Sequence, residues 1–251
     1  ATGGLRITQL NLIELFIKFN EICKTNNVEY WVDGGTLIGT VRHRGFVPWD
    51  DDIDVCMTRN NFEKLFEVVT KESPDFSIAY YCSWEGEVFP KFISKANTFF
   101  FIDICIYDEV DCRSWEEALA LWHTRDSLQL SYRKEMLKMF DFDVTVNEYA
   151  RWSLNPELKC LYSEKLKCSV GGNFMFVSLQ HPSDFCQWPR IYERKTILPL
   201  RSAEFEGISV FVPNEYNKYL EDIYGNIWSL PDDFGMKRHF TIKEFRKTLR
   251  S

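Results

Sequence analysis

Apolar residues recur at helical spacing near the start of the chain. Leu12, Phe16 and Phe19 lie three or four positions apart, the pattern of an amphipathic helix with one buried face. Further along, Ser114 and Glu117 have the spacing of a capping box at the head of a long helix. We predict helices over 10–24, 59–71, 114–140 and 215–224, a short helix capped by Thr36 and ending near Val41, and another starting at Asn155-Pro156.

Strands are predicted where acidic and apolar residues alternate, or where aromatic and β-branched residues gather. Residues 52–57 show the alternation, and Asp103 interrupts the longest apolar stretch. The glycine pairs at 34–35 and 171–172 are typical of turns. The predicted strands are 30–33, 52–57, 77–82, 88–94, 98–107, 174–179, 196–199 and 208–212.

This order of elements predicts an α/β (α+β) fold with a mixed sheet core flanked by helices. The chain shows no repeat, no low-complexity segment and no change of composition typical of a linker. We predict a core in residues 1–112. We expect residues 113–251 to form a mostly helical region with short strands that packs on the core and completes the substrate cleft.

Composition narrows the class of protein. The chain has 251 residues, of which 45% are hydrophobic, enough for a buried core without disulfides. The formal net charge of −7 argues against a nucleic-acid partner, because such binding depends largely on basic residues. No stretch reaches the roughly 18 apolar residues of a transmembrane helix, so we expect no such segment and a cytoplasmic location.

The eight cysteines form no Cys-x-x-Cys motif. Their ordinary role is that of small buried hydrophobic residues. Two alternatives stay open, a disulfide set and a zinc site, because ligands distant in sequence can converge in a fold. The cysteines considered for these are 105, 112, 160, 168 and 186.

Acidic residues form the most distinctive pattern in the sequence. On an extended strand Asp50, Asp52 and Asp54 would point to one face. Such crowding is unfavourable unless a cation lies among the carboxylates, and oxygen ligands suit Mg²⁺ or Mn²⁺. Asp103 fits the same site, because an unpaired carboxylate is unlikely in an apolar strand. With the backbone N–H groups of the Gly34-Gly35 turn, which can approach a phosphate, these acids predict a phosphoryl-transfer site.

The acidic run has two other interpretations. Taken alone, residues 50–54 have the character of a solvated loop. A calcium-binding loop is disfavoured, because the glycine expected after the third acidic ligand position is missing. The combination with Asp103 and the glycine turn favours the metal and phosphate site.

Residues 30–55, YWVDGGTLIGTVRHRGFVPWDDDIDV, resemble the signature of the LicD family of phosphocholine transferases. That family belongs to the nucleotidyltransferase-fold superfamily, together with fukutin and fukutin-related protein. Phe101–Ile104 resembles the family's second acidic strand, whereas Cys105–Asp108 departs from the Phe-Pro-Leu-Asp of bacterial members. The resemblance implies that residues 1–112 are a nucleotidyltransferase-like catalytic core.

The resemblance also implies an activity, which is transfer of phosphocholine from CDP-choline to a glycan or glycolipid hydroxyl with release of CMP. The expected alternatives are another CDP-alcohol donor such as CDP-ribitol, a true nucleotidyltransferase using a nucleoside triphosphate, and a non-catalytic binding module of the same fold. Location could then include membrane association through the acceptor, or the Golgi lumen for a eukaryotic fukutin-like relative. The expected metal ligands and catalytic residues are Asp52, Asp54 and Asp103, and the expected substrate contacts are Gly34, Gly35, Thr36, Arg42 and Lys91.

Overall fold

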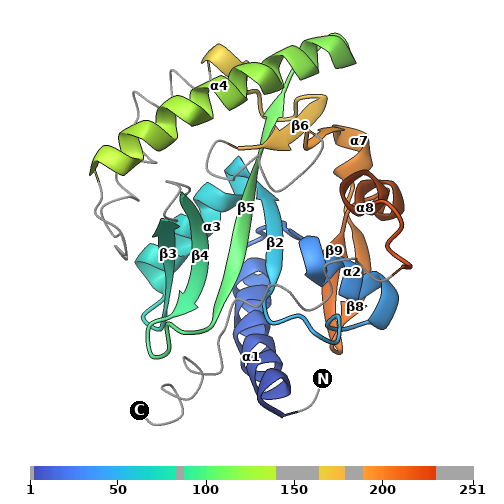
Figure 1. Ribbon diagram of the computed structural model, residues 1–251. Coiled ribbons are helices and arrows are strands. Elements are labelled where there is room, and N and C mark those ends of the chain that lie inside the picture. Colours follow the sequence, from blue (N-terminus) through green and yellow to red (C-terminus); the bar gives the residue numbers. More distant parts are fainter. Residues whose placement is uncertain (1–2, 83–87, 140–163, 179–188, 230–251) are drawn as a thin grey trace.

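The computed structural model describes residues 3–82, 88–139, 164–178 and 189–229, and Figure 1 shows their arrangement. The helices are α1 (Gly3–Thr25), α2 (Gly34–His43), α3 (Arg59–Glu72), α4 (Trp115–Met139), α7 (Arg194–Ile197) and α8 (Tyr216–Tyr224). The strands are β1 (Trp31–Val32), β2 (Asp54–Thr58), β3 (Phe76–Cys82), β4 (Val88–Ser94), β5 (Phe101–Val110), β6 (Phe174–Val177), β7 (Ile191–Glu193), β8 (Arg201–Phe205) and β9 (Ile208–Val212).

One mixed sheet dominates the molecule. Its strands follow the order β1-β2-β5-β4-β3, and β6 and β7 extend it from the last part of β5. The pair β2–β5 is parallel and the other pairs in the sheet are antiparallel. The predicted mixed α/β fold is confirmed. Because β6 and β7 follow residue 112, the sheet continues past the predicted boundary, and the division into 1–112 and 113–251 stays a prediction.

Strand β5 organises the sheet because it pairs with three other strands. Its first residues pair with β4, its centre with β2 and its last residues with β6. This strand was predicted at 98–107 but lies three residues later. The chain turns before it, where the N–H of Phe99 donates to the Asn97 side chain over 3.1 Å. That side-chain bond satisfies a backbone group outside the sheet.

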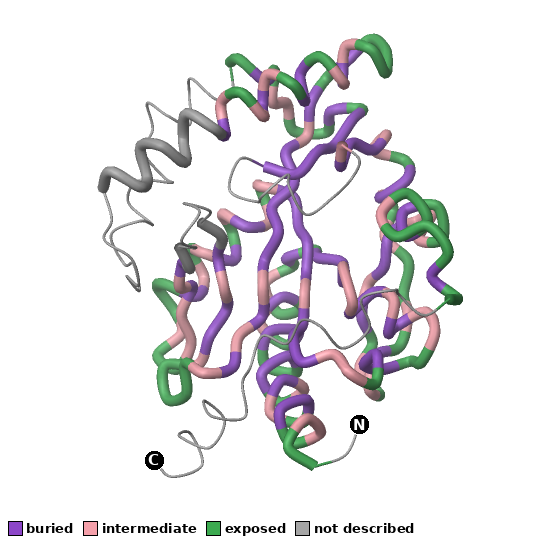
Figure 2. Tube along the Cα trace, in the orientation of Figure 1, coloured by how far each residue is buried: buried purple, intermediate pink, exposed green. Residues whose placement is uncertain are grey.

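Aromatic side chains join α1 to the sheet. The ring of Phe19 lies 5.0 Å from that of Tyr30 and 5.3 Å from that of Phe92, both edge to face. Such pairs stabilise a core beyond the apolar area that they bury. Figure 2 shows that β5 and β2 are mostly buried, whereas the outer helices carry exposed residues. The predicted amphipathic helix 10–24 is confirmed within α1.

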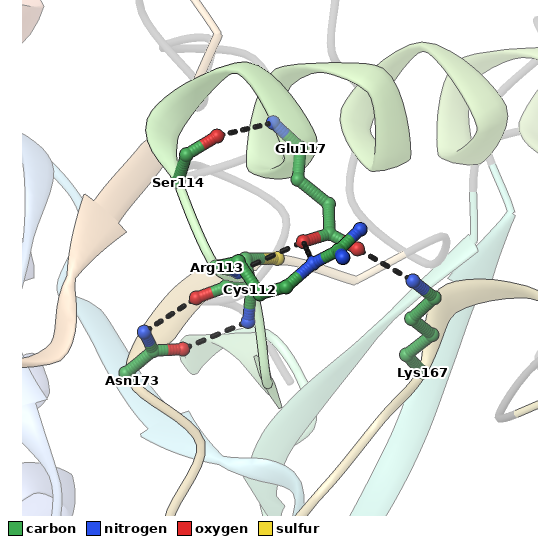
Figure 3. Close-up of polar contacts among 6 residues, drawn as sticks. All are labelled: Cys112, Arg113, Ser114, Glu117, Lys167 and Asn173. Carbon is green, nitrogen blue, oxygen red and sulfur yellow. Dashed lines mark hydrogen bonds and ion pairs between the residues drawn. The ribbon is translucent and has the colours of Figure 1, made fainter.

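The start of α4 is fixed by polar contacts, which Figure 3 shows. The Ser114 hydroxyl accepts the N–H of Glu117, as the predicted capping box requires. The Glu117 carboxylate accepts the N–H of Arg113 over 2.8 Å and contacts Lys167 over 2.6 Å. Lys167, followed by Arg113, lowers the pKa of Glu117 to about 2. Asn173 bonds both backbone groups of Cys112, so this helix is tied to the segment before β6.

Two predicted elements have other outcomes, and two strands were not predicted. The strand expected at 196–199 is wrong, because α7 occupies Arg194–Ile197. This single turn ends before Pro199, since the residue preceding a proline is driven to extended backbone, as Leu198 is. The helix expected from Asn155 lies outside the described residues. The strands β7 and β8 were not predicted, because they are short and lack clear alternation.

Candidate active site

The site begins where β1 runs into α2. Gly34 has a φ of +55°, a left-handed backbone that glycine adopts without steric cost. A Cβ atom on Gly34 would lie 2.5 Å from Oδ2 of Asp54, and one on Gly35 would lie 2.2 Å from Oδ2 of Asp50. The two glycines therefore allow two carboxylates to approach the start of α2, where the helix dipole favours negative charge.

Thr36 has a different role from the predicted helix cap. Helix α2 starts at Gly34, two residues before Thr36, because the N–H of Leu37 already bonds to the carbonyl of Asp33 over 2.9 Å. The Thr36 hydroxyl instead accepts the backbone N–H of Asp54 over 2.9 Å. Thr36 thus joins the glycine turn to the strand that carries the acids.

The three predicted metal ligands come together. Asp54 and Asp103 are register partners in the parallel pair β2–β5, and the N–H of Asp103 donates to the carbonyl of Ile53 over 2.9 Å. Asp52, Asp54 and Asp103 each offer a carboxylate oxygen, and these oxygens lie within 4.8 Å of one another. The prediction that two acidic segments meet on neighbouring strands is confirmed.

The predicted alternation of Asp50, Asp52 and Asp54 on one strand face is wrong in part. Strand β2 starts only at Asp54, so the strand period does not apply to the residues before it. Asp50, Asp51 and Asp52 form a second group whose oxygens also lie within 4.8 Å, and Asp51 and Asp52 are buried. Asp51 was not among the predicted site residues.

The loop that carries these acids is anchored on both sides. The Gln9 side chain in α1 donates to the carbonyl of Asp50 over 2.9 Å. The Glu206 carboxylate contacts Arg6 over 3.0 Å and accepts the N–H of Phe46 over 3.3 Å. These contacts hold the loop from helix α1 and from the turn between β8 and β9.

Electrostatics favour a cation at the group of Asp52, Asp54 and Asp103. Burial raises the pKa of Asp54 well above its ordinary value, and the charges of Asp52 and Asp103 raise it further. A divalent cation would remove this penalty, because it makes the ionised form of each carboxyl favourable. The donors are all carboxylate oxygens, the ligands preferred by Mg²⁺ and Mn²⁺, so the residues fit such an ion.

Lys91, a predicted phosphate contact, lies against the acidic group. Its ammonium is 2.7 Å from Oδ1 of Asp103 and 3.3 Å from the centre of the Phe101 ring. Lys91 and Asp103 are register partners in β4 and β5. The ammonium therefore offsets part of the negative charge of the cluster, and its contact with phosphate stays a prediction.

Arg42, the other predicted phosphate contact, lies in the last turn of α2. It is eight residues after Gly34, roughly 12 Å along the helix axis at the standard rise. Arg44, two residues further, lines a cavity of about 600 Å³ between α2 and the β8–β9 hairpin. The proposed contact of Arg42 with phosphate stays a prediction.

A buried polar network below the glycine turn was not predicted. The Asp33 carboxylate accepts from Arg190 over 2.5 Å and from the Tyr219 hydroxyl over 2.8 Å. Arg190 also donates to the Tyr219 oxygen over 2.6 Å, and Tyr107 lies 3.0 Å from that oxygen. Burial raises the pKa of Asp33, but the charge and hydrogen bond of Arg190 outweigh burial and lower it. Only the acid before the glycines was visible in sequence, because Arg190 and Tyr219 are more than 150 residues away from it.

The described cysteines support the simplest prediction for this residue type. Cys23, Cys56, Cys105, Cys112 and Cys168 are not joined in disulfides. Among the described residues, both groups that could hold a metal consist of aspartates. A zinc or disulfide site built from the described members of the proposed set is therefore not formed, while Cys160 and Cys186 lie outside the described residues.

The fold and the site together define an α/β protein with two acidic segments beside a glycine-led helix. Residues 27–142 match the LicD/FKTN/FKRP nucleotidyltransferase domain, which bears out the resemblance to the LicD family. The chain is 28% identical to the lipopolysaccharide cholinephosphotransferase LicD of Haemophilus influenzae over 94% of this chain and 95% of that protein.

Two shorter matches accompany this one. The ribitol 5-phosphate transferase FKRP of Homo sapiens is 41% identical over 14% of this chain and 7% of its own length. An uncharacterized protein of Rickettsia prowazekii is 33% identical over 28% of this chain and 27% of its own length. None of the helices described here has the length and apolar character needed to cross a membrane. The predicted cellular location stays a prediction.

Proposed function

We propose that this protein is a metal-dependent transferase that moves phosphocholine from CDP-choline to a glycan or glycolipid hydroxyl and releases CMP. The observation that carries the proposal is the carboxylate group of Asp52, Asp54 and Asp103 beside the glycine-led start of α2. The similarity to a lipopolysaccharide cholinephosphotransferase over almost the whole chain supports this choice of donor and acceptor class.

In this proposal Asp52, Asp54 and Asp103 hold Mg²⁺ or Mn²⁺. When bound, the ion offsets charge on the transferred phosphate and on the leaving group. The backbone at Gly34 and Gly35 has no side chain to keep a phosphate away, and Thr36 fixes this turn against Asp54. The turn therefore binds and orients the diphosphate of the donor.

The chemistry is an in-line displacement at phosphorus. The acceptor hydroxyl oxygen forms a bond to the phosphorus that carries choline, and the bond from that phosphorus to the bridging oxygen breaks. The electron pair of the broken bond leaves with CMP. The carboxylate of Asp103 accepts the hydroxyl proton, and Lys91 keeps that carboxylate oriented through its contact of 2.7 Å.

A second donor is favoured by one observation. The matching segment of the human ribitol 5-phosphate transferase is 41% identical over 34 residues. CDP-ribitol would use the same acidic group and glycine turn, but its headgroup would be recognised through hydroxyls. A nucleoside triphosphate is the third candidate, because the matched domain is described as a nucleotidyltransferase domain.

The test is release of CMP from CDP-choline, CDP-ribitol and CDP-ethanolamine in parallel, each with Mg²⁺, Mn²⁺ or EDTA, with pyrophosphate release from CTP measured alongside. We expect metal-dependent CMP from CDP-choline, through slow hydrolysis even without acceptor. Asp52→Asn should abolish it, and Asp111→Asn is the matched control, because Asp111 is an exposed acid after β5. CMP from another donor alone would replace the proposed substrate, and pyrophosphate from CTP alone would refute the proposed reaction.

A further inference from the structure

Asp33 does not cap its own helix. It occupies the N-cap position of α2, yet its side chain makes no capping hydrogen bond, although aspartate at this position normally accepts from the first helical turn. Both carboxylate oxygens are directed elsewhere, one to Arg190 and the other to Tyr219. Asp33 is 5% exposed, so the carboxylate is held by protein groups and not by solvent.

The backbone of the same residue joins both halves of the proposed site. Its N–H donates to the carbonyl of Asp54 over 3.0 Å, and its carbonyl accepts the N–H of Leu37 over 2.9 Å. A shift of Asp33 would therefore move the metal ligand on β2 and the first turn of α2 together. Asp33 therefore fixes the geometry between the carboxylate and the proposed phosphate-binding turn, together with the bond from Asp54 to Thr36.

Two of the groups that hold Asp33, Arg190 and Tyr219, come from outside the matched family domain, which ends at residue 142. Arg190 immediately precedes β7 and Tyr219 lies in α8. The Tyr219 hydroxyl donates to Asp33, and its oxygen accepts from Arg190. The Tyr107 hydroxyl of β5 lies 3.0 Å from the same oxygen. With the Cys56 thiol of β2, which donates to the same carboxylate over 3.1 Å, three side chains from different parts of the fold meet on Asp33.

From this convergence we propose that Arg190 and Tyr219 are positioning residues of the active site. They clamp Asp33 and so set the distance between the acidic group and the glycine turn. The inference rests on the proposed function for its consequence in catalysis, but the clamp itself can be tested without substrate. Groups that orient metal ligands from behind typically change metal affinity or activity about 10–100-fold when removed.

Four variants form two matched pairs. Arg190→Met removes the charged group that holds Asp33. Its control, Arg59→Met, breaks an ion pair with Asp108, whose side chain is 1% exposed. Tyr219→Phe removes only one hydroxyl. Its control Tyr30→Phe removes a buried hydroxyl that donates to Asn20 over 2.9 Å. Each control removes a polar contact that does not involve Asp33.

Two readouts are measured on each full-length variant, the affinity for Mn²⁺ alone and amide hydrogen exchange of peptides covering α2. For Arg190→Met we expect roughly 10–100-fold weaker Mn²⁺ binding and exchange in α2 accelerated at least about tenfold relative to α1. Tyr219→Phe should show both effects at about threefold to tenfold. Arg190→Lys should retain more Mn²⁺ affinity than Arg190→Met, and both controls should stay within about twofold of wild type.

Changes in Arg190→Met and Tyr219→Phe that match those of their controls would overturn the inference. Faster exchange with unchanged Mn²⁺ affinity would also overturn it, since the clamp would then hold α2 without positioning the acids. If wild-type protein binds no Mn²⁺, the metal site of the proposed function is refuted. The clamp is then tested by amide exchange alone, which should be faster in α2 than in α1 when Arg190 or Tyr219 is changed.

Discussion

Asp54→Asn should make the metal-free protein more stable. The Asp54 carboxyl is crowded by Asp52 and Asp103, and burial adds to the penalty on its ionised form. Asparagine keeps the size of the side chain and removes the charge. The backbone bonds of residue 54, to Thr36 and to Asp33, do not involve the carboxylate and should persist.

The magnitude follows from the separation of the carboxylates. Oxygens of Asp54 and each neighbour lie within 4.8 Å, where two charges at an effective dielectric constant of about 20 repel by roughly 3.5 kcal/mol. Lys91 offsets part of the charge of Asp103, and partial protonation of Asp54 caps the penalty. We expect a net gain of about 1–3 kcal/mol at pH 8 in EDTA, or roughly 3–9 °C in Tm for a domain of this size.

The pH dependence has a definite sign. Because the pKa of Asp54 is raised in the folded protein, the folded state holds a proton that the unfolded state has already released. The free energy of unfolding therefore falls as pH rises from the ordinary aspartate pKa through the raised one. Thermal unfolding in EDTA between pH 4 and 8 should show this fall in wild type and a smaller fall in Asp54→Asn.

Magnesium should reverse the order of stability. Saturation at 100 times the Kd stabilises a protein by about 2.7 kcal/mol, so Mg²⁺ should raise the Tm of wild type at pH 8 and leave Asp54→Asn nearly unchanged. The exposed Asp111→Asn is the charge-matched control and should behave as wild type. A lower Tm for Asp54→Asn in EDTA, or a full Mg²⁺ shift in that variant, would refute the electrostatic reasoning.

Three further predictions test other parts of the site. Asp103→Asn should lower the rate of CMP release at least about 100-fold with the fold retained, because one metal ligand and the proton acceptor are lost. A near-normal rate would mean that Asp103 has only a structural role in the sheet. Gly34→Ala should lower the free energy of unfolding in urea by about 1–2 kcal/mol, because the backbone of this residue is left-handed, and should lose donor binding in equilibrium dialysis. Gly171→Ala, with open space around it, should lower the free energy of unfolding but keep donor binding. Burial raises the pKa of the Cys23 and Cys56 thiols, so both should resist a thiol reagent until the protein unfolds, and rapid labelling of the native protein would contradict their burial.

Local patterns were sufficient for many elements of this fold. The strands at 88–94 and 208–212 have the predicted bounds, and the helix over 59–72 extends the prediction by one residue. These segments show strong periodicity, and their hydrogen bonds are either local or run to a neighbouring strand. The failure at 196–199 has a local cause too, since a proline two residues after a buried isoleucine ended a helical turn and not a strand.

The sequence by itself determined which residues carry the acids and where the glycine turn lies, because those residues are close along the chain or interrupt an apolar strand. Only the tertiary structure decided which acids share a group, since strand β2 begins at Asp54 and Asp52 belongs both to the group with Asp54 and Asp103 and to the group with Asp50 and Asp51. It also decided that Lys91 contacts Asp103, and that Arg190 and Tyr219 hold Asp33. Those contacts join residues far apart in sequence, and pairing across such distances is fixed by strand register and packing, which no local pattern encodes.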